Sequence, residues 1–240
     1  MKKTLKKLPF LLAFLLLFSC DEFNRDETAA ALKEALTVGA QYALKTLGAQ
    51  DGFYLDLAVK IGLPQDVAKI VKQISAVPGF NIIIKEIEDQ LVLTINRAAE
   101  ASIEGVIPIV IDAITTMTIQ EASNILFSNN NVAATDYLRV KTYDPLCDIC
   151  RSVIEDALNK KIVANTSAQD VWGNFTKYYN MAALVPGVKL DPVETNLSLY
   201  TTQKALDGVF VKVGDEEVKI RTDVNARVTD LLRRVFGRLD

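Results

Sequence analysis

The chain has 240 residues, of which 50% are hydrophobic and 24% are charged, with a net charge of −3 and no histidine. This composition is ordinary for a folded protein and excludes collagen-like, disulfide-dense and disordered chains. Without histidine the chain can form neither a Ser-His-Asp triad, nor a Cys-His dyad, nor an HExxH zinc site. Glycine-rich phosphate loops and calcium loops are also missing from the sequence, so we expect no cofactor and no metal site.

The first twenty residues have the order of a bacterial lipoprotein signal. Lysines at positions 2, 3, 6 and 7 precede an apolar run, Pro9 to Phe18, that is too short to span a bilayer of about 30 Å as a helix. The run ends in Leu17-Phe18-Ser19-Cys20, which is similar to a lipobox, where the cysteine is lipidated and becomes the new N-terminus. The alternative is an ordinary secretory signal that happens to end in cysteine.

We therefore predict a signal peptide over residues 1–19, a lipidated Cys20 with a short acidic tether over residues 20–28, and a helical domain over residues 29–240. The mature chain would have 221 residues, 23 of them basic and 30 acidic, for a net charge of −7. Such an acidic body is not typical of nucleic-acid-binding proteins. The expected location is the bacterial cell envelope, on the periplasmic side or the cell surface, with the membrane as a partner through Cys20.

The remainder of the chain is predicted to be all-α, folded as a single compact multi-helix bundle of about eight to ten helices. A run of β-branched residues over 106–111 is also compatible with a strand, but Pro108 favours a short buried helix. Residues 49–63 and 181–199 are expected to be irregular. Helices are expected over residues 26–48, 64–77, 80–102, 106–111, 118–127, 132–142, 145–160, 168–179, 202–213 and 224–236.

Three blocks of sequence, in a fixed order, resemble a known family. The first is Asn96-Arg97-Ala98-Ala99-Glu100 followed by Asp112-Ala113-Ile114 and Met117-Thr118; the second is Tyr137 with Lys141-Thr142. The third includes Lys204-Ala205-Leu206-Asp207-Gly208, Glu217, Ile220-Arg221 and Ala226-Arg227. Together they resemble a bacterial envelope family known as domain of unknown function 4197. The resemblance implies a mostly helical exported protein and brings no activity, cofactor or catalytic residue.

Two acidic side chains on apolar helices need an explanation. Helical spacing points Asn96 and Glu100 into packing and leaves Arg97 in water. Asp112 lies within a similarly apolar segment. A buried carboxylate without partners costs several kcal/mol, so both acids are expected to find a cation or other donors.

Arg221 and Arg227 are the expected partners of these acids, because a guanidinium at the edge of the last apolar stripe can bind a carboxylate with two parallel hydrogen bonds. One interpretation is a buried network that fixes helix register. The other is a ligand pocket in which Glu100, Asn96 and an arginine grip a bound molecule. A His-free hydrolase using Glu100 or Asp112 is a third interpretation, although their spacing does not require it.

Cys147 and Cys150 form the single reactive-looking motif. With Asp144 as N-cap and Pro145 in the first turn, Cys147 would sit where a helix dipole stabilises a thiolate, whereas Asp148 would disfavour it. The pair is interpreted either as a redox pair or as structural cysteines, free or joined in a local disulfide.

From these features we expect a binding or structural protein rather than an enzyme. Its partner would be an envelope protein or an apolar ligand held among the helices. The alternatives are a thiol-redox accessory protein using Cys147 and Cys150, and the carboxylate hydrolase.

Overall fold

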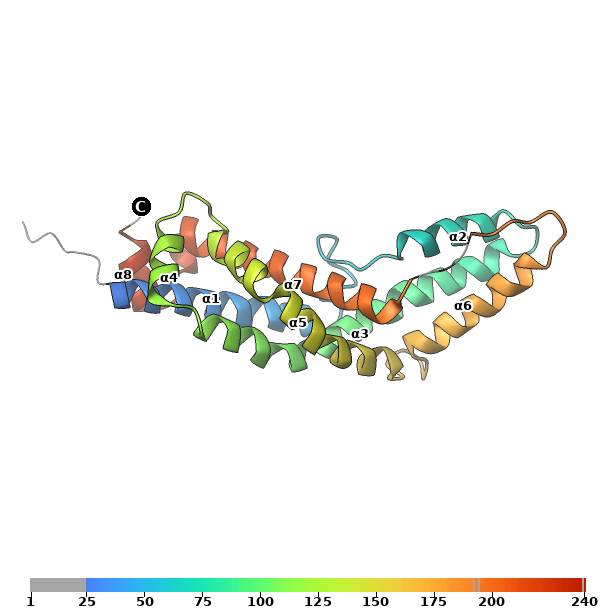
Figure 1. The fold of residues 1–240 in the computed structure, drawn as a ribbon, viewed down its shortest axis with the longest axis horizontal. Coiled ribbons are helices and arrows are strands. Elements are labelled where there is room, and N and C mark those ends of the chain that lie inside the picture. The colour runs from blue at the N-terminus through green and yellow to red at the C-terminus, as the bar shows by residue number, and fades with distance from the viewer. Residues whose placement is uncertain (1–24, 192, 194, 239) are drawn as a thin grey trace, which may run out of the picture.

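A long four-helix bundle forms the body of the protein in the computed structural model, which describes residues 25–191, 193, 195–238 and 240 (Figure 1). Helices α1 (Arg25–Gly48), α3 (Asn81–Thr115), α5 (Ala133–Asn159) and α7 (Leu197–Thr222) make the bundle, with α1 and α5 each packed against both α3 and α7. The remaining helices pack on the outside of it. They are α2 (Gln65–Ser75) and α6 (Ala168–Ala183) on α3, and α4 (Ile119–Leu126) and α8 (Asp230–Phe236) on α1.

The predicted all-α multi-helix bundle is therefore confirmed. The described residues include eight α-helices, a short 3₁₀ helix at Val224–Ala226 and no strand. Figure 1 shows that the bundle is elongated, with α4, α8 and the start of α1 at one end and α2 and the far end of α6 at the other. α1 begins at Arg25, inside the segment predicted as the tether, and residues 20–24 of that segment lie outside the described residues.

Capping side chains define several helix starts as the sequence indicates. Thr118 accepts a hydrogen bond from the Glu121 amide, and Glu121 reaches back to the Thr118 amide, which is the predicted capping box. Ser167 and Asp170 form a second capping box at the start of α6. These side chains satisfy amide groups that have no partner inside their own helix.

Pro108 was expected within a short separate helix and Pro145 at the start of one, but both lie inside much longer helices. Pro108 is within α3 and Pro145 is within α5, so the helices predicted separately over 80–102 and 106–111, and over 132–142 and 145–160, are each continuous. An interior proline removes one backbone hydrogen bond and costs about 3 kcal/mol in an isolated helix. Packing of α3 and α5 against each other and against α1 and α7 outweighs that local cost.

The irregular segment over residues 49–63, here called the 49–63 loop, packs against both α3 and α7. Phe53 is fully buried at the side of Gly208 in α7, where an added Cβ would come within 2.8 Å of the Phe53 ring. The Asp56 carboxylate bonds the Lys212 ammonium at 2.5 Å. This contact and the hydrogen bond from the Ala58 amide outweigh the opposing effect of burial and hold the pKa of Asp56 below its usual value. The loop is thus attached to the bundle on two sides and positions the site described next.

Within the described residues, no single helix is long and apolar enough to cross a membrane. In this part of the chain, α3 and α4 taken together, across a bend of 93°, meet that requirement by length and composition.

Candidate functional site

Asn96 and Glu100, one turn apart on α3, hold the 49–63 loop through its backbone. The Asn96 amide accepts from the Ile61 N–H at 2.9 Å and donates to the Ile61 carbonyl at 2.7 Å. Glu100 Oε1 accepts from the amides of Phe53 and Tyr54, both at 3.1 Å. Both side chains are buried, as predicted, and their partners are backbone groups that would otherwise be buried without hydrogen bonds.

Arg97 completes this cluster and is itself mostly buried, with 16% of its side chain exposed. Its guanidinium donates to Glu100 Oε2 and to Asp51 Oδ1, each at 2.6 Å. Burial opposes the charge on Arg97, but the two carboxylates outweigh it and raise the pKa above its usual value. Arg97 was expected to reach water; instead it is the cation that balances Glu100.

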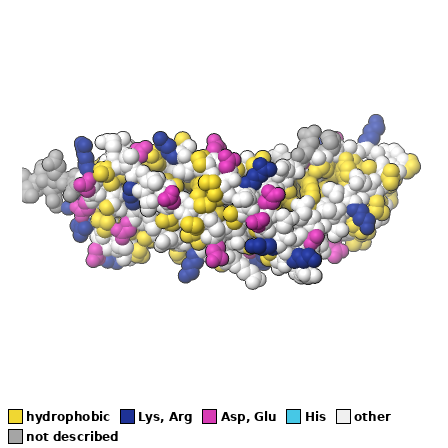
Figure 2. Space-filling model, turned by 60° about the horizontal axis from the view of Figure 1, so that its bottom comes forward, with side chains coloured by type: hydrophobic (Ala, Val, Ile, Leu, Met, Phe, Trp, Pro, Cys, Tyr) yellow, Lys and Arg dark blue, Asp and Glu magenta, His cyan; other side chains and the backbone are white. Residues whose placement is uncertain are grey.

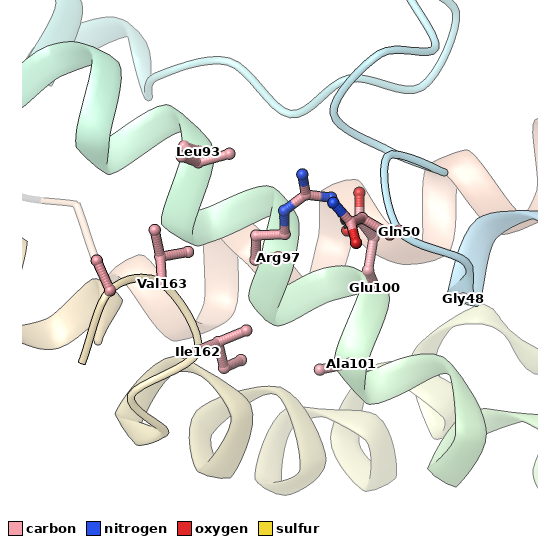
Figure 3. A pocket seen from close by; sticks show the side chains of 9 residues that line it. Gly48, Gln50, Leu93, Arg97, Glu100, Ala101, Ile162 and Val163 are labelled. Carbon is pink, nitrogen blue, oxygen red and sulfur yellow. Dashed lines mark hydrogen bonds and ion pairs between the residues drawn. The ribbon is translucent and has the colours of Figure 1, made fainter. Parts of the chain in front are cut away.

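Arg97 and Glu100 also line a groove on the outer face of α3 (Figure 3). The groove has a volume of about 500 Å³, with Leu93, Arg97 and Ala101 on its floor. The start of the 49–63 loop forms one wall, and the segment Ile162 to Ala164 before α6 forms the other. A second hollow of about 410 Å³, lined by Tyr54 and Ile82 among others, shares Leu93 with the first. The two hollows therefore run along one face of α3.

Backbone conformation at both walls supports this arrangement. Positive φ values of 69°, 46° and 60° occur at Asp51, next to Gln50 of one wall, at Ala164 of the other wall, and at the following Asn165. Such values are uncommon for residues with a Cβ and persist where the surrounding structure holds them. For Asp51 the hydrogen bond from Arg97 is that holding contact.

Glu217, on α7, is a second buried carboxylate and lies against the start of α5. It accepts from the amides of Ala134 and Thr135 at 3.1 and 2.8 Å, and from the Thr135 hydroxyl at 2.8 Å. Arg221 Nε donates to Glu217 at 2.9 Å, and its other nitrogens donate to the carbonyls of Ile125 and Leu126 at the end of α4. One ion pair thus satisfies the end of α4 and the start of α5.

Arg227 donates hydrogen bonds to carbonyl groups at the end of α7, as Arg221 does at the end of α4. Only 1% of it is exposed, and it donates to the carbonyls of Ile220 and Arg221 at 2.9 and 3.0 Å. It also forms a two-pronged ion pair with Asp240, with both distances 2.7 Å. The bidentate geometry was predicted, but the acid is the last residue of the chain rather than Glu100 or Asp112.

A comparison with protein families matches residues 22–237 to a family described as "Protein of unknown function (DUF4197)". The chain belongs to the DUF4197 family. No curated protein and no solved structure matches it. In this DUF4197 chain three of the residues that suggested the family, Glu217, Arg221 and Arg227, have buried charged side chains that satisfy helix ends.

The predicted single network of Asn96, Glu100, Asp112, Arg221 and Arg227 is not formed. Asp112 is exposed, and the two arginines bind Glu217 and Asp240 instead. The physical reason is that α3 is one helix of 35 residues, so Glu100 and Asp112 are about 18 Å apart along its axis at 1.5 Å per residue. That distance is too large for a pair of carboxylates acting on one glycosidic bond.

Cys147 and Cys150 are free thiols buried in the middle of α5. Because α5 continues through Pro145, Cys147 is not in a first turn and gains nothing from a helix N-terminus. Burial, followed by Asp148 and Asp144, raises the pKa of Cys147; burial raises the pKa of Cys150 to about 11. Raised thiol pKa values lower the thiolate fraction at neutral pH and do not favour redox chemistry.

Among the described residues, no three His, Cys, Asp or Glu side chains are grouped to hold a metal ion. Cys20, the predicted lipidation site, lies outside the described residues. Sequence reasoning missed the 162–164 segment that lines the groove, Tyr54 in the second hollow, and Asp51 as an acceptor for Arg97. The i,i+3 spacing of Arg97 and Glu100 was an available signal for their ion pair, whereas nothing in the sequence indicates which loop covers them.

Proposed function

We propose that this DUF4197 protein is a lipid-anchored protein of the bacterial envelope that works by binding an apolar ligand in the groove on α3. The observation that carries the proposal is the groove itself. Its volume of about 500 Å³ is in the range typical of small-molecule sites, and its lining combines aliphatic side chains with a few convergent polar groups.

The polar groups favour a particular class of ligand. Arg97 uses donors of its guanidinium for Glu100 and Asp51 and retains others, since a guanidinium has five. The three side chains together carry a net charge of −1, so the cluster disfavours an anion. A mostly apolar molecule with an uncharged acceptor, such as a carbonyl or hydroxyl oxygen, fits the groove best.

Glu100 acts in this proposal as a structural acceptor rather than as an acid or base. Its two oxygens accept three hydrogen bonds, two from the loop backbone and one from Arg97. The carboxylate therefore fixes both the wall of the groove and the direction of Arg97. Such preorganisation lowers the cost of ordering a binding site.

Native mass spectrometry of the full chain extracted from membranes tests ligand binding. We expect the wild-type protein to retain an added mass and Leu93→Glu, which places a charge on the floor of the groove, to lose it. Val140→Glu is the matched control, because it adds the same charge at an apolar side chain that is 85% exposed on α5. An empty wild-type protein, or retention by Leu93→Glu, would contradict the proposed site.

Labelling of cells with an alkyne fatty acid tests the anchor separately. We expect the wild-type chain to carry the label and Cys20→Ala to lack it. Cys147→Ala is the control, since it removes a thiol from the body of the protein and leaves the lipobox-like sequence intact. Label on Cys20→Ala would show that acylation occurs elsewhere.

A further inference from the structure

The two ends of the molecule lie at different distances from Cys20, the proposed lipid anchor, on which this inference rests. Cys20 precedes the first residue of α1 by five positions, and five residues span at most about 18 Å. The first turn of α1 is fixed to α8 by an ion pair of 2.6 Å between Glu27 and Arg234. The end formed by α4, α8 and the start of α1, here called the proximal end, is therefore the end nearest the bilayer (Figure 1).

The proximal end exposes apolar side chains on two adjacent connections. Phe127, which ends α4, is 51% exposed, and Val224 and Val228, between α7 and α8, are each 58% exposed. Arg221 joins these connections, because it lies near the end of α7 and donates to the Leu126 carbonyl beside Phe127. Exposed apolar groups on a surface held near lipid gain by entering the interface.

The arginines at this end are paired with acidic side chains, so the surface that they form is not strongly cationic. Arg233 and Arg234 in α8 are exposed, but they pair with Asp230 and Glu27 respectively. Figure 2 shows acidic and basic side chains interleaved with hydrophobic ones at this end of the visible face. Arginine side chains can reach phosphate groups while neighbouring apolar side chains insert.

We propose that the proximal end rests on the bilayer surface, with Phe127, Val224 and Val228 in the headgroup region. The long axis of the bundle then points away from the membrane. At 1.5 Å per residue, the 26 residues of α7 alone extend about 39 Å, so the α2 and α6 end is held well clear of the lipid. The groove on α3 is then presented to the aqueous side instead of to the bilayer.

Fluorescence quenching in vesicles tests the orientation. Phe127→Cys and Val228→Cys would be labelled with a polarity-sensitive fluorophore in the full lipidated chain. The protein would be reconstituted in phosphatidylethanolamine and phosphatidylglycerol vesicles containing a nitroxide-bearing phospholipid. Leu184→Cys is the matched control, since Leu184 follows α6 at the opposite end and is 83% exposed. Wild-type protein reports any labelling of the buried Cys147 and Cys150.

We expect at least twofold stronger quenching at positions 127 and 228 than at 184, with blue-shifted emission at the first two alone. Equal quenching at all three positions, or stronger quenching at 184, would overturn the orientation. Flotation of unlabelled wild-type protein with the vesicles reports the anchor alone. A protein that floats but shows no proximal quenching refutes this inference only, whereas a protein that does not float refutes both proposals.

Discussion

Buried charged side chains in this protein complete the hydrogen bonding of backbone that has no partner of its own. Glu100 accepts from a loop, Glu217 accepts from the first turn of α5, and Arg227 donates to the last carbonyls of α7. In each case the counter-charge is close by, so the side chain is both paired and hydrogen-bonded. These are the conditions under which a buried charge is tolerated.

Replacing Glu100 by glutamine separates its charge from its shape. Glu100→Gln keeps an acceptor for the Phe53 and Tyr54 amides but removes the ion pair with Arg97, so we expect unfolding free energy to fall by about 1–3 kcal/mol. Glu104→Gln, at an exposed position one turn further along α3, should change it by less than about 0.5 kcal/mol. Urea denaturation measures both, and equal effects would show that the Glu100 charge has no structural role.

Titration of the buried thiol of Cys150 and of the half-buried phenol of Tyr143 should lower the stability of the protein at alkaline pH. Burial raises the pKa of Cys150 to about 11, and burial, before any nearby carboxylate, raises that of Tyr143 to about 12. Above the usual thiol pKa of 9.0 the unfolded chain loses these protons first and binds fewer than the folded chain. Stability must then fall as pH rises.

We expect the thermal midpoint to decrease steadily above about pH 9, where the unfolded thiols begin to ionise. Alkylation of Cys147 and Cys150 by iodoacetamide at pH 7 should be much slower than that of free cysteine, and denaturant should remove the difference. Rapid alkylation of native protein at pH 7 would instead support the redox interpretation. Scanning calorimetry from pH 7 to 10.5 and mass spectrometry of the alkylated chain provide the measurements.

Close approach between elements depends on a few small residues. The 49–63 loop reaches α7 only because Gly208 leaves room for the Phe53 ring. Neither the loop nor the helix shows this in its own sequence pattern. The contact matters for the site, since the same loop supplies the wall beside Arg97.

Adding a methyl group at Gly208 tests that contact. Gly208→Ala would bring a Cβ to 2.8 Å from Phe53, and we expect a loss of about 1–3 kcal/mol from overpacking. Gly173→Ala in α6 is the control, because no atom lies within 4 Å of its added Cβ. That control should gain about 0.5–1 kcal/mol from improved helix propensity. If Gly208→Ala left the unfolding free energy unchanged, the loop would be able to shift and accommodate the added methyl group.

The whole molecule is an elongated bundle rather than a sphere, and small-angle scattering can measure this shape in solution. A globular chain of this size has a radius of gyration of about 17 Å. We expect small-angle scattering from the chain lacking residues 1–19 to give a clearly larger value, with a long tail in the distance distribution, in keeping with Figure 1. A value near 17 Å would mean that the bundle folds back on itself.

The sequence by itself determined the all-α class, the family, the capping box at Thr118 and the burial of Asn96 and Glu100, because periodicity and capping are local properties. Helix lengths, and the loop or chain end that lies beside each buried charge, were decided by tertiary structure. Pro108 and Pro145 would break isolated helices, yet packing across the bundle keeps α3 and α5 continuous. Helical spacing is compatible with the pairs Arg97–Glu100 and Glu217–Arg221. It does not encode that Asp51 lies beside Arg97 or that Asp240 lies beside Arg227.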